Sequence, residues 1–518
     1  MSVAALNDWE VESWDVSAAF LQGLGFSEVT RVARALGVPP PLVERQVCIT
    51  VPGNVWYHLH ELGFLPSGCT PKQAQQKYVL QLEKPMYGLN DAPKLWQLSL
   101  RYHLQCIMGA RVSAHDENFF FWKTGNLLTG VCTTHVDDTS NTGPKSMLQE
   151  RRASLEKRYG KLAVQTLPFQ HVGVTFERDK SGLKLHQREF ALALKPVSIE
   201  RGRAPDSPLT PAELTTLRGA LGGLLYLTYT RPDLSADVVL LQSKITKATI
   251  AELRQCNTVV RRAHQNAGRG LFFPKLHPPL CLMAIADASF STKSTSYAVE
   301  GTLTVLRTAP SNLQPGTQSA KVWSGPCHVL AHHSGKAKRV SHSTSHAETL
   351  AAYSTLSTTE QAAERFTELT APKKPSVDDL IDMSSRGLYD MPVHHFTDCF
   401  DLVELATGSR GCPQDRSQRL IVLSIRERRL LGKTQSTNHL QTQDMPCNAL
   451  TKSDPADRQL ARLLESGMLV FEHATVHRPV QHVTENYDEA DLLSYNDDTS
   501  AAQKRPTAAW SLEQAKRK

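Results

Sequence analysis

Two proline-rich stretches constrain the fold of this 518-residue chain more than any other feature. The stretch RAPDSPLTP occupies residues 203–211, and PKLHPPL occupies residues 274–280. Proline interrupts helices and sheet interiors, so such clusters mark the ends of folding units. Since a chain of this length also exceeds what one hydrophobic core usually serves, we expect three units, over residues 1–200, 201–275 and 276–455.

Composition excludes several classes of protein. Hydrophobic residues make up 40% and charged residues 21% of the chain, which is the range of folded globular proteins. The ten cysteines form no C-x-x-C pair, which favours reduced thiols and an intracellular protein. No signal-peptide pattern opens the chain, and the longest apolar run, residues 219–229, is too short to span a bilayer. We therefore expect no membrane partner.

The end of the chain and its net charge allow weaker inferences. From Thr484 onward the sequence is polar and has few periodic apolar residues, so residues 456–518 are expected to form a largely disordered tail. The net charge of +7 suits a phosphate-rich partner but is common in other proteins. The sequence leaves the oligomeric state open and does not distinguish cytoplasm from nucleus.

Local patterns predict individual elements. FFFWKTGNLLTGVCT, residues 119–133, reads as two strands joined by a turn at Gly125 and Asn126. CLMAIADASF, residues 281–290, reads as a buried strand with an acid near its end. Thr210, Pro211 and Glu213 form a helix start, and four leucines follow on one predicted helical face: Leu214, Leu217, Leu221 and Leu225.

Asp137 and Asp138 form the first group of candidate catalytic residues. They occupy a second tight turn directly after the predicted hairpin, and Asp15 lies at a strand end far upstream. Paired carboxylates on rigid backbone can bind two metal ions for phosphoryl transfer. Taken alone, however, the pair is more simply explained as an acidic turn, because Asp is common in turns for backbone reasons.

A second group of acids lies in the third unit and contains Asp287, Glu348 and Asp398. Their spacing places them at a strand end, on a helix and at a second strand end, from which three carboxylates can converge on metal ions. The structural alternatives are a capping box formed by Ser345 and Glu348, and simple turn positions for the two aspartates.

Several sequence blocks together resemble the Pol polyprotein of copia-type retrotransposons. The resemblance covers roughly residues 14–452, and its blocks follow one another in family order: WDVSAAFLQG from Trp14, EKPMYGLNDAPKLW from Glu83, THVDDTS from Thr134, FQHVGVTFERDKSGLKLHQ from Phe169, YLTYTRPDLSADV from Tyr226, AIADASFS from Ala284, SHSTSHAETLAAY from Ser341, HHFTDCFDLVE from His394 and QDMPCNALTKSDP from Gln443. The resemblance implies an α/β (α+β) protein with a right-hand polymerase palm and thumb, truncated fingers and a ribonuclease H-like domain.

The resemblance also implies roles for single residues. Asp15, Asp137 and Asp138 would bind two Mg²⁺ ions of a reverse transcriptase, and Phe20 would stack under the sugar of the incoming nucleotide. Lys94 could contact the template backbone, since phosphate contacts need only charge and reach. Asp287, Glu348 and Asp398 would bind the Mg²⁺ ions of the ribonuclease H site. The implied partners are an RNA template, a DNA primer, an RNA–DNA hybrid and deoxynucleoside triphosphates.

Departures from the family pattern support a second hypothesis, a degenerate element remnant that at most binds nucleic acid. Asn448 stands where the family has a fourth catalytic aspartate, and a neutral amide binds a hard cation more weakly than a carboxylate. Only fourteen residues precede Asp15, so a fingers segment is expected to be missing. Three further positions differ from the family: Asp91, His135 and Cys399.

Overall fold

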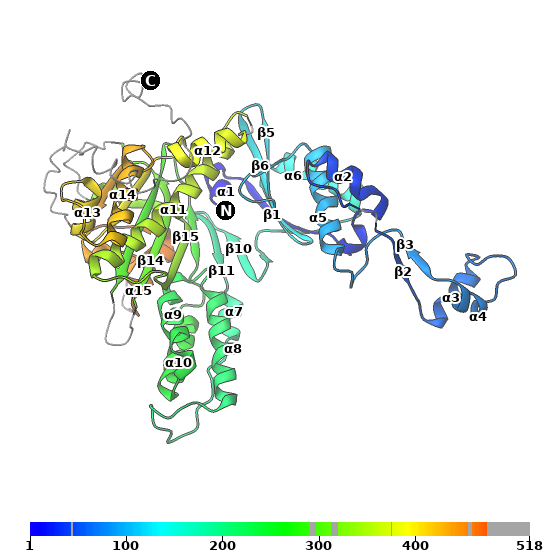
Figure 1. The fold of residues 1–518 in the computed structure, drawn as a ribbon, viewed down its shortest axis with the longest axis horizontal. Coiled ribbons are helices and arrows are strands. Elements are labelled where there is room, and N and C mark those ends of the chain that lie inside the picture. Colours follow the sequence, from blue (N-terminus) through cyan, green and yellow to red (C-terminus); the bar gives the residue numbers. More distant parts are fainter. Residues whose placement is uncertain (43–44, 291–296, 312–319, 374, 454–457, 474–518) are drawn as a thin grey trace, which may run out of the picture.

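The computed structural model describes residues 1–42, 45–290, 297–311, 320–373, 375–453 and 458–473. The predicted mixture of helices and sheets is confirmed, with the first 170 residues on one side of Figure 1 and the residues beyond 276 on the other. A group of helices, α8 to α10, projects between these two bodies. Among the described residues, no helix is both long and apolar enough to cross a membrane.

The first sheet is antiparallel and has the strand order β4-β5-β6-β7-β1-β8. Its strands are β1 (Glu10–Asp15), β4 (Arg111–Val112), β5 (Phe119–Thr124), β6 (Leu127–His135), β7 (Asp138–Gly143) and β8 (Ala163–Thr166). The predicted hairpin is confirmed as β5 and β6, with Gly125 at a positive φ of 59° that favours glycine. Helices α5 (Ala92–Tyr102) and α6 (Lys145–Tyr159) cover one face, where Trp14, Trp96 and Leu148 form a buried cluster.

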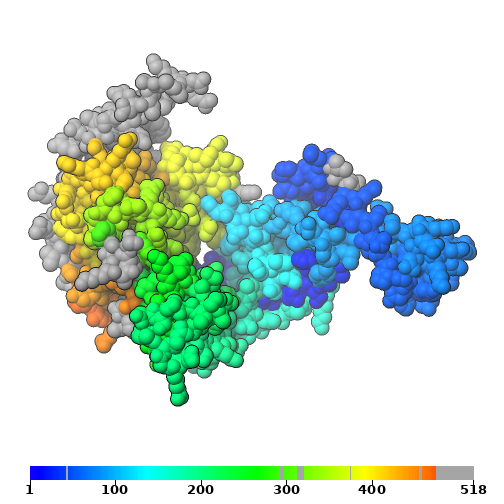
Figure 2. All heavy atoms as spheres, turned by 60° about the horizontal axis from the view of Figure 1, so that its bottom comes forward, coloured from blue at the N-terminus to red at the C-terminus, as the bar shows by residue number. Residues whose placement is uncertain are grey.

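A smaller unit extends from the first sheet on a two-stranded ribbon, and Figures 1 and 2 show it projecting away from the rest of the molecule. The ribbon and the helices of this N-terminal part are α1 (Ser2–Asn7), α2 (Val29–Ala35), β2 (Val47–Ile49), α3 (Gly53–Glu61), α4 (Pro71–Lys77) and β3 (Leu80–Leu82).

The second sheet joins strands from both sides of the helical group, in the order β12-β11-β10-β9. Its strands and the intervening helices are β9 (Phe169–His171), β10 (Val174–Arg178), β11 (Gly182–His186), α7 (Arg188–Ala193), α8 (Pro211–Leu227), α9 (Ser235–Ser243), α10 (Ile250–Gln265) and β12 (Leu271–Pro274). The predicted start of α8 is confirmed, because Thr210 and Glu213 form a capping box. The predicted face is wrong at its end, since Leu224 is buried and Leu225 is 46% exposed.

The third sheet has the order β17-β16-β13-β14-β15-β18, with β13 antiparallel to β14 and parallel to β16. Its strands are β13 (Leu280–Ser289), β14 (Val299–Thr308), β15 (Gly325–Lys336), β16 (Val393–Thr397), β17 (Ser436–His439) and β18 (Met468–Leu469). Its helices are α11 (Thr344–Thr370), α12 (Val377–Arg386), α13 (Phe400–Thr407), α14 (Arg416–Leu430), α15 (Asn448–Thr451) and α16 (Arg458–Ser466).

Buried apolar clusters lie on both faces of this third sheet. A strand covered on both faces carries apolar residues at successive positions, which explains the confirmed prediction of a buried strand at β13. The expected start of the tail at residue 456 is too early. Helix α16 buries Leu460, Leu463 and Leu464 in this core, and β18 pairs with β15. Residues 474–518, where the rest of the tail was expected, lie outside the described residues.

Candidate active sites

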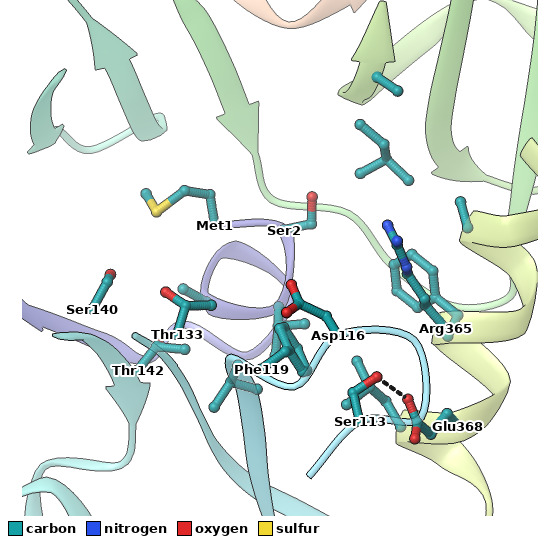
Figure 3. Close-up of a pocket in the computed structure, with 18 of the residues that line it drawn as sticks. Met1, Ser2, Ser113, Asp116, Phe119, Thr133, Ser140, Thr142, Arg365 and Glu368 are labelled. Atoms are coloured by element: carbon teal, nitrogen blue, oxygen red, sulfur yellow. Dashed lines mark hydrogen bonds between the residues drawn. The ribbon is translucent and has the colours of Figure 1, made fainter. Parts of the chain in front are cut away.

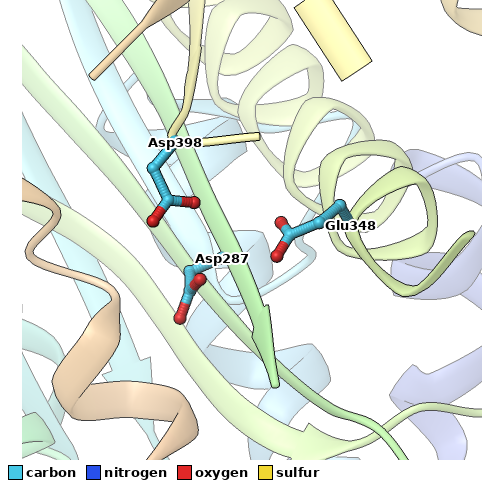
Figure 4. Close-up of side chains that lie close together, drawn as sticks. All are labelled: Asp287, Glu348 and Asp398. Atoms are coloured by element: carbon cyan, nitrogen blue, oxygen red, sulfur yellow. The ribbon is translucent and has the colours of Figure 1, made fainter. Parts of the chain in front are cut away.

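Asp287, Glu348 and Asp398 converge at one edge of the third sheet. Asp287 lies near the end of β13, and Asp398 directly follows the parallel neighbour β16, so both carboxylates leave the sheet at the same edge. Glu348 reaches them from the second turn of α11. One ligand atom from each residue lies within 4.8 Å of the other two, as Figure 4 shows. The structure therefore brings together the three acids of the second predicted group.

The electrostatics of this triad are those of crowded, buried carboxylates. Burial, followed by repulsion from Asp287 and Asp398, raises the pKa of Glu348 to about 9. Burial, followed by the charge of Asp398, raises the pKa of Asp287 to about 6. The Oε1 atom of Glu348 accepts a hydrogen bond from the backbone nitrogen of Ala288 at 3.1 Å, while its buried Oε2 atom has no hydrogen-bond partner. A buried, unpaired oxygen facing two further carboxylates suits a divalent cation.

The structural alternatives fail for Glu348 and Asp287, whereas Asp398 does lie in a bend directly after β16. Helix α11 is capped by Ser343, whose side chain accepts a hydrogen bond from the His346 nitrogen at 3.1 Å. Ser345 lies inside the helix, so Ser345 and Glu348 form no capping box. Asp287 lies within a strand and is 2% exposed, which excludes a turn position. Neither a helix cap nor a turn therefore explains why Glu348 and Asp287 occupy these positions.

In the sequence block that carries Asn448, the residue that contacts the triad is Thr451. Asn448 begins α15, and its side-chain nitrogen donates to the Thr442 carbonyl at 2.7 Å. Thr451, at the end of the same short helix, donates from Oγ1 to Oδ2 of Asp287 at 2.5 Å. Sequence reasoning missed this threonine, although it belongs to the motif quoted for the block. A contact across 164 residues has no local signal that would have revealed it.

Cys399 follows the third acid of the triad, where the family usually has Asn. Burial is the main cause that raises the pKa of its thiol to about 12, and nearby carboxylates add to the effect. The thiol is therefore uncharged near neutral pH. It adds no negative charge to the triad.

Asp15, Asp137 and Asp138 lie together at the edge of the first sheet. Asp15 ends β1 and is the register partner of Asp138, which begins β7, and Asp137 occupies the turn just before it. Burial, then the charges of Asp137 and Asp138, raise the pKa of Asp15. Among the residues that the structure describes, only the triad of the third sheet brings three acidic, His or Cys ligand atoms within 4.8 Å of one another. The aspartates of the first sheet are thus neighbours in a more open arrangement.

The predicted substrate-binding residues are Phe20 and Lys94. Phe20 is half-buried, with its ring centroid 5.3 Å from that of Tyr87. Lys94 is exposed at the start of α5, where Nζ donates to Oε1 of Gln97 at 2.9 Å. A cavity of about 440 Å³ lies beside the aspartate hairpin, and its lining includes Lys94, Arg101 and His135. Lys94 and Arg101 bring positive charge to this largely apolar cavity, which suits a ligand with an anionic group.

The structure places two of the residues that depart from the family pattern, Asp91 and His135. Asp91 forms an ion pair with Arg45, so the extra negative charge is compensated where it arises. His135 ends β6 and is the register partner of Asp138, which places it beside the aspartate hairpin.

A second cavity, of about 360 Å³, lies where the first sheet meets α11 (Figure 3). Val11, Ser140 and Thr142 line it from the first sheet, and Phe366 and Leu369 line it from the helix. Residues two apart along a strand share a face, so the cavity lies on the same face of the sheet as Asp15 and Asp138. Its lining marks the junction between the first and third sheets.

Comparisons with known proteins were made for the whole chain. No protein-family model matches it. Two retrovirus-related Pol polyproteins of Arabidopsis thaliana, from transposons RE1 and RE2, are 26% and 27% identical to it over 311 residues. Each match covers 57% of this chain and 19% of the relative.

Among solved structures, a foamy viral protease-reverse transcriptase in complex with an RNA/DNA hybrid aligns with 84% of this chain and 44% of its own, at 12% identity and a TM-score of 0.39. The sequence comparisons confirm the predicted resemblance to a Pol polyprotein. The chain is therefore similar to the retrovirus-related Pol polyproteins of transposons, and the match spans about a fifth of their length.

Proposed function

We propose that this chain is the reverse transcriptase and ribonuclease H segment of a copia-type retrotransposon Pol polyprotein. In this proposal the first sheet is the polymerase palm, helices α8 to α10 form the thumb or connection, and the third sheet carries the ribonuclease H-like site. The observation that carries the proposal is the buried triad of Asp287, Glu348 and Asp398 with its unpaired carboxylate oxygen.

The donor set of the triad fits Mg²⁺, because hard cations prefer carboxylate oxygens and would relieve the repulsion that raises the pKa values of Glu348 and Asp287. Bound Mg²⁺ would supply the positive charge that stabilises the developing charges of phosphodiester hydrolysis. The protein's own part is to hold three carboxylates on a strand, a strand end and a long helix, where packing fixes their positions. The proposed substrate is the RNA strand of an RNA–DNA hybrid.

At the first sheet, Asp15, Asp137 and Asp138 would hold Mg²⁺ for nucleotide addition to a DNA primer on an RNA template. Phe20 would lie beneath the sugar of the incoming deoxynucleoside triphosphate. Lys94 would bind template phosphate, since it is exposed and lines the cavity beside the aspartate hairpin.

One observation favours the alternative of an inactive remnant that still binds nucleic acid. Asn448 occupies the position of the family's fourth acid, and its amide is already engaged with the carbonyl of Thr442. The amide is uncharged, so it attracts a cation less strongly than a carboxylate does. On this alternative, hybrid binding persists while hydrolysis is lost.

Primer extension tests the polymerase half of the proposal. A labelled DNA primer on an RNA template is incubated with the full chain, deoxynucleoside triphosphates and Mg²⁺. Asp138→Asn should abolish extension, because it removes one of the paired charges, while Asp206→Asn at an exposed position of the helical unit should not. Extension that is equal in both variants would reject Asp138 as a catalytic residue, and no extension by the natural chain would support the remnant.

A further inference from the structure

Thr451 makes a buried hydrogen bond to the triad. Its Oγ1 atom donates to Oδ2 of Asp287 at 2.5 Å, and the two residues are 1% and 2% exposed. In so dry a setting this bond restrains the carboxylate strongly, because water cannot compete for it. We propose that Thr451 is a positioning residue of the hydrolytic site, which orients Asp287 for a divalent cation. This inference rests on the proposed function of the triad.

The surroundings hold Thr451 in place against the sheet. A Cβ atom at Gly301 would lie 2.7 Å from Cγ2 of Thr451 and 2.9 Å from the carbonyl oxygen of Cys447. Only a glycine therefore allows α15 to approach β14 this closely. On the neighbouring strand, the hydroxyl of Ser289 donates to the Thr451 carbonyl at 3.2 Å. The close packing at Gly301 and the hydrogen bond from Ser289 thus hold Thr451 beside Asp287.

A buried carboxylate anchors the loop before α15. Asp444 is fully buried and accepts hydrogen bonds from the side chain of Gln459, from the backbone nitrogen of Glu472 and from both the backbone and the ring of His473. These donors occupy both oxygens of Asp444. Asp444 is therefore not available to act as the fourth acid in place of Asn448. Instead it ties residues 458–473 to the segment that ends in Thr451.

The hydrogen bond from Thr451 affects how Asp287 is oriented when a cation binds. A hydroxyl has one proton to donate, and Asn448 offers a second acceptor, its carbonyl oxygen, 3.2 Å from the Thr451 Oγ1. When the proton goes to Asp287, the carboxylate is held in one orientation before the cation arrives. Partners of metal ligands in this outer position typically contribute about 10- to 100-fold in metal affinity.

Mn²⁺ binding to the full chain, measured by titration calorimetry, provides the test. Thr451→Ser and Thr451→Ala both lose the methyl group and differ only in the hydroxyl, so they form a matched pair. Binding that disappears in Glu348→Gln is assigned to the triad. We expect Thr451→Ser to stay within about threefold of the natural affinity and Thr451→Ala to lose about tenfold or more.

The outcomes separate this inference from the function on which it rests. Equal triad affinities in the Ser and Ala variants would overturn the positioning role and leave the proposed site intact. If the natural chain shows no Glu348-dependent Mn²⁺ binding, both fail. Should Thr451→Ala not fold, Thr451→Val serves instead, because it keeps the methyl group against Gly301 and lacks the hydroxyl. An Mn²⁺ affinity of Thr451→Val equal to that of the natural chain would then overturn the positioning role.

Discussion

At the residue scale, Glu348 departs furthest from an ordinary acid. Its carboxyl group is buried on a helix that it does not cap, one oxygen has no partner, and its pKa is raised to about 9. An arrangement of this kind costs folding free energy in the absence of a cation. Such a cost at a cluster of acids is typical of functional sites.

The first prediction is that the metal-free chain loses stability as the pH rises, and that Glu348→Gln removes this loss. The folded-state pKa lies above the ordinary value of 4.5, so the folded protein holds the proton more tightly than the unfolded chain. The cost is absent below pH 4.5 and grows until the pH passes about 9. The natural chain should lose on the order of 1 kcal/mol per pH unit relative to Glu348→Gln.

Urea unfolding in a chelator at pH 6, 7 and 8 measures this difference, because the buried histidines contribute equally to the pH dependence of both proteins and their contribution cancels. Parallel pH profiles for the two proteins would show that Glu348 is not a strained carboxylate. Addition of Mg²⁺ should flatten the profile of the natural chain only.

Val136 supports a second prediction at this scale. It lies in the turn before Asp137 with φ of 58°, a conformation that costs a non-glycine residue about 1–2 kcal/mol. Asn tolerates this region better, so Val136→Asn should raise the free energy of unfolding by about 1 kcal/mol. The backbone carbonyl of Val136, which accepts from the Trp96 indole, is retained. A destabilised Val136→Asn protein in chemical denaturation would show that the turn is not strained there.

Individual site residues differ in how well the sequence predicted them. The acids could be proposed because the chemistry of metal-dependent phosphoryl transfer requires carboxylates, and because their blocks follow a family order. Thr451 could not, since its role depends on the approach of α15 to β14 at Gly301. The compensation of Asp91 by Arg45 likewise depends on a contact across 46 residues of chain.

At the scale of elements, local patterns predicted those parts whose periodicity or capping is local. The hairpin of β5 and β6, the start of α8 and the buried strand β13 are examples. The prediction for α8 was wrong near Leu225, because tertiary packing buries Leu224 instead. Helix α16 was missed because its amphipathic pattern is short and lies beyond residue 455, the expected end of the third unit.

Helix α11 connects the third sheet to the first. It has 27 residues, which corresponds to roughly 40 Å. Glu348 lies near its start, and near its end Glu368 accepts from the hydroxyl of Ser113 at 2.6 Å and from the backbone nitrogen of Ala114 at 2.7 Å. The Lys123 ammonium donates to the carbonyls of Leu369 and Ala371. These contacts join the helix to the first sheet.

The third prediction concerns this junction. Glu368→Ala should destabilise the chain by about 2–4 kcal/mol, because it leaves a hydroxyl and a backbone N–H without their charged acceptor. Gln361→Ala, at an exposed position of the same helix, should change stability by less than about 0.5 kcal/mol. Chemical denaturation of both variants checks the difference. Equal stabilities would mean that the two bodies associate without this contact.

For the molecule as a whole, the sequence did not predict how distant segments of the chain contact one another. The junction at Glu368 connects residues that are 255 positions apart, and no periodicity records such a pairing. The projecting unit of α3 and α4 was also not anticipated, although α4 starts with a capping box of Thr70 and Gln73 and has Pro71 in its first turn, the same kind of local signal that predicted the start of α8.

The fourth prediction is that the full chain binds an RNA–DNA hybrid with micromolar-range affinity that falls steeply with salt. Contacts to backbone phosphate release counterions, so the logarithm of the affinity should fall linearly with the logarithm of the salt concentration. Fluorescence anisotropy at several salt concentrations gives the slope. An affinity that does not depend on salt, or no binding at low salt, would contradict both the enzyme and the remnant.

Hybrid cleavage in Mg²⁺ by the natural chain and by Asn448→Asp tests the central claim most directly. The triad and the restored carboxylate should together complete a two-metal site. We predict negligible cleavage by the natural chain, measurable cleavage by Asn448→Asp, and none by Asn448→Asp combined with Asp287→Asn, with similar hybrid affinity in all three. Cleavage by the natural chain as fast as by Asn448→Asp would contradict the assignment of Asn448, and cleavage that survives Asp287→Asn would contradict the triad itself.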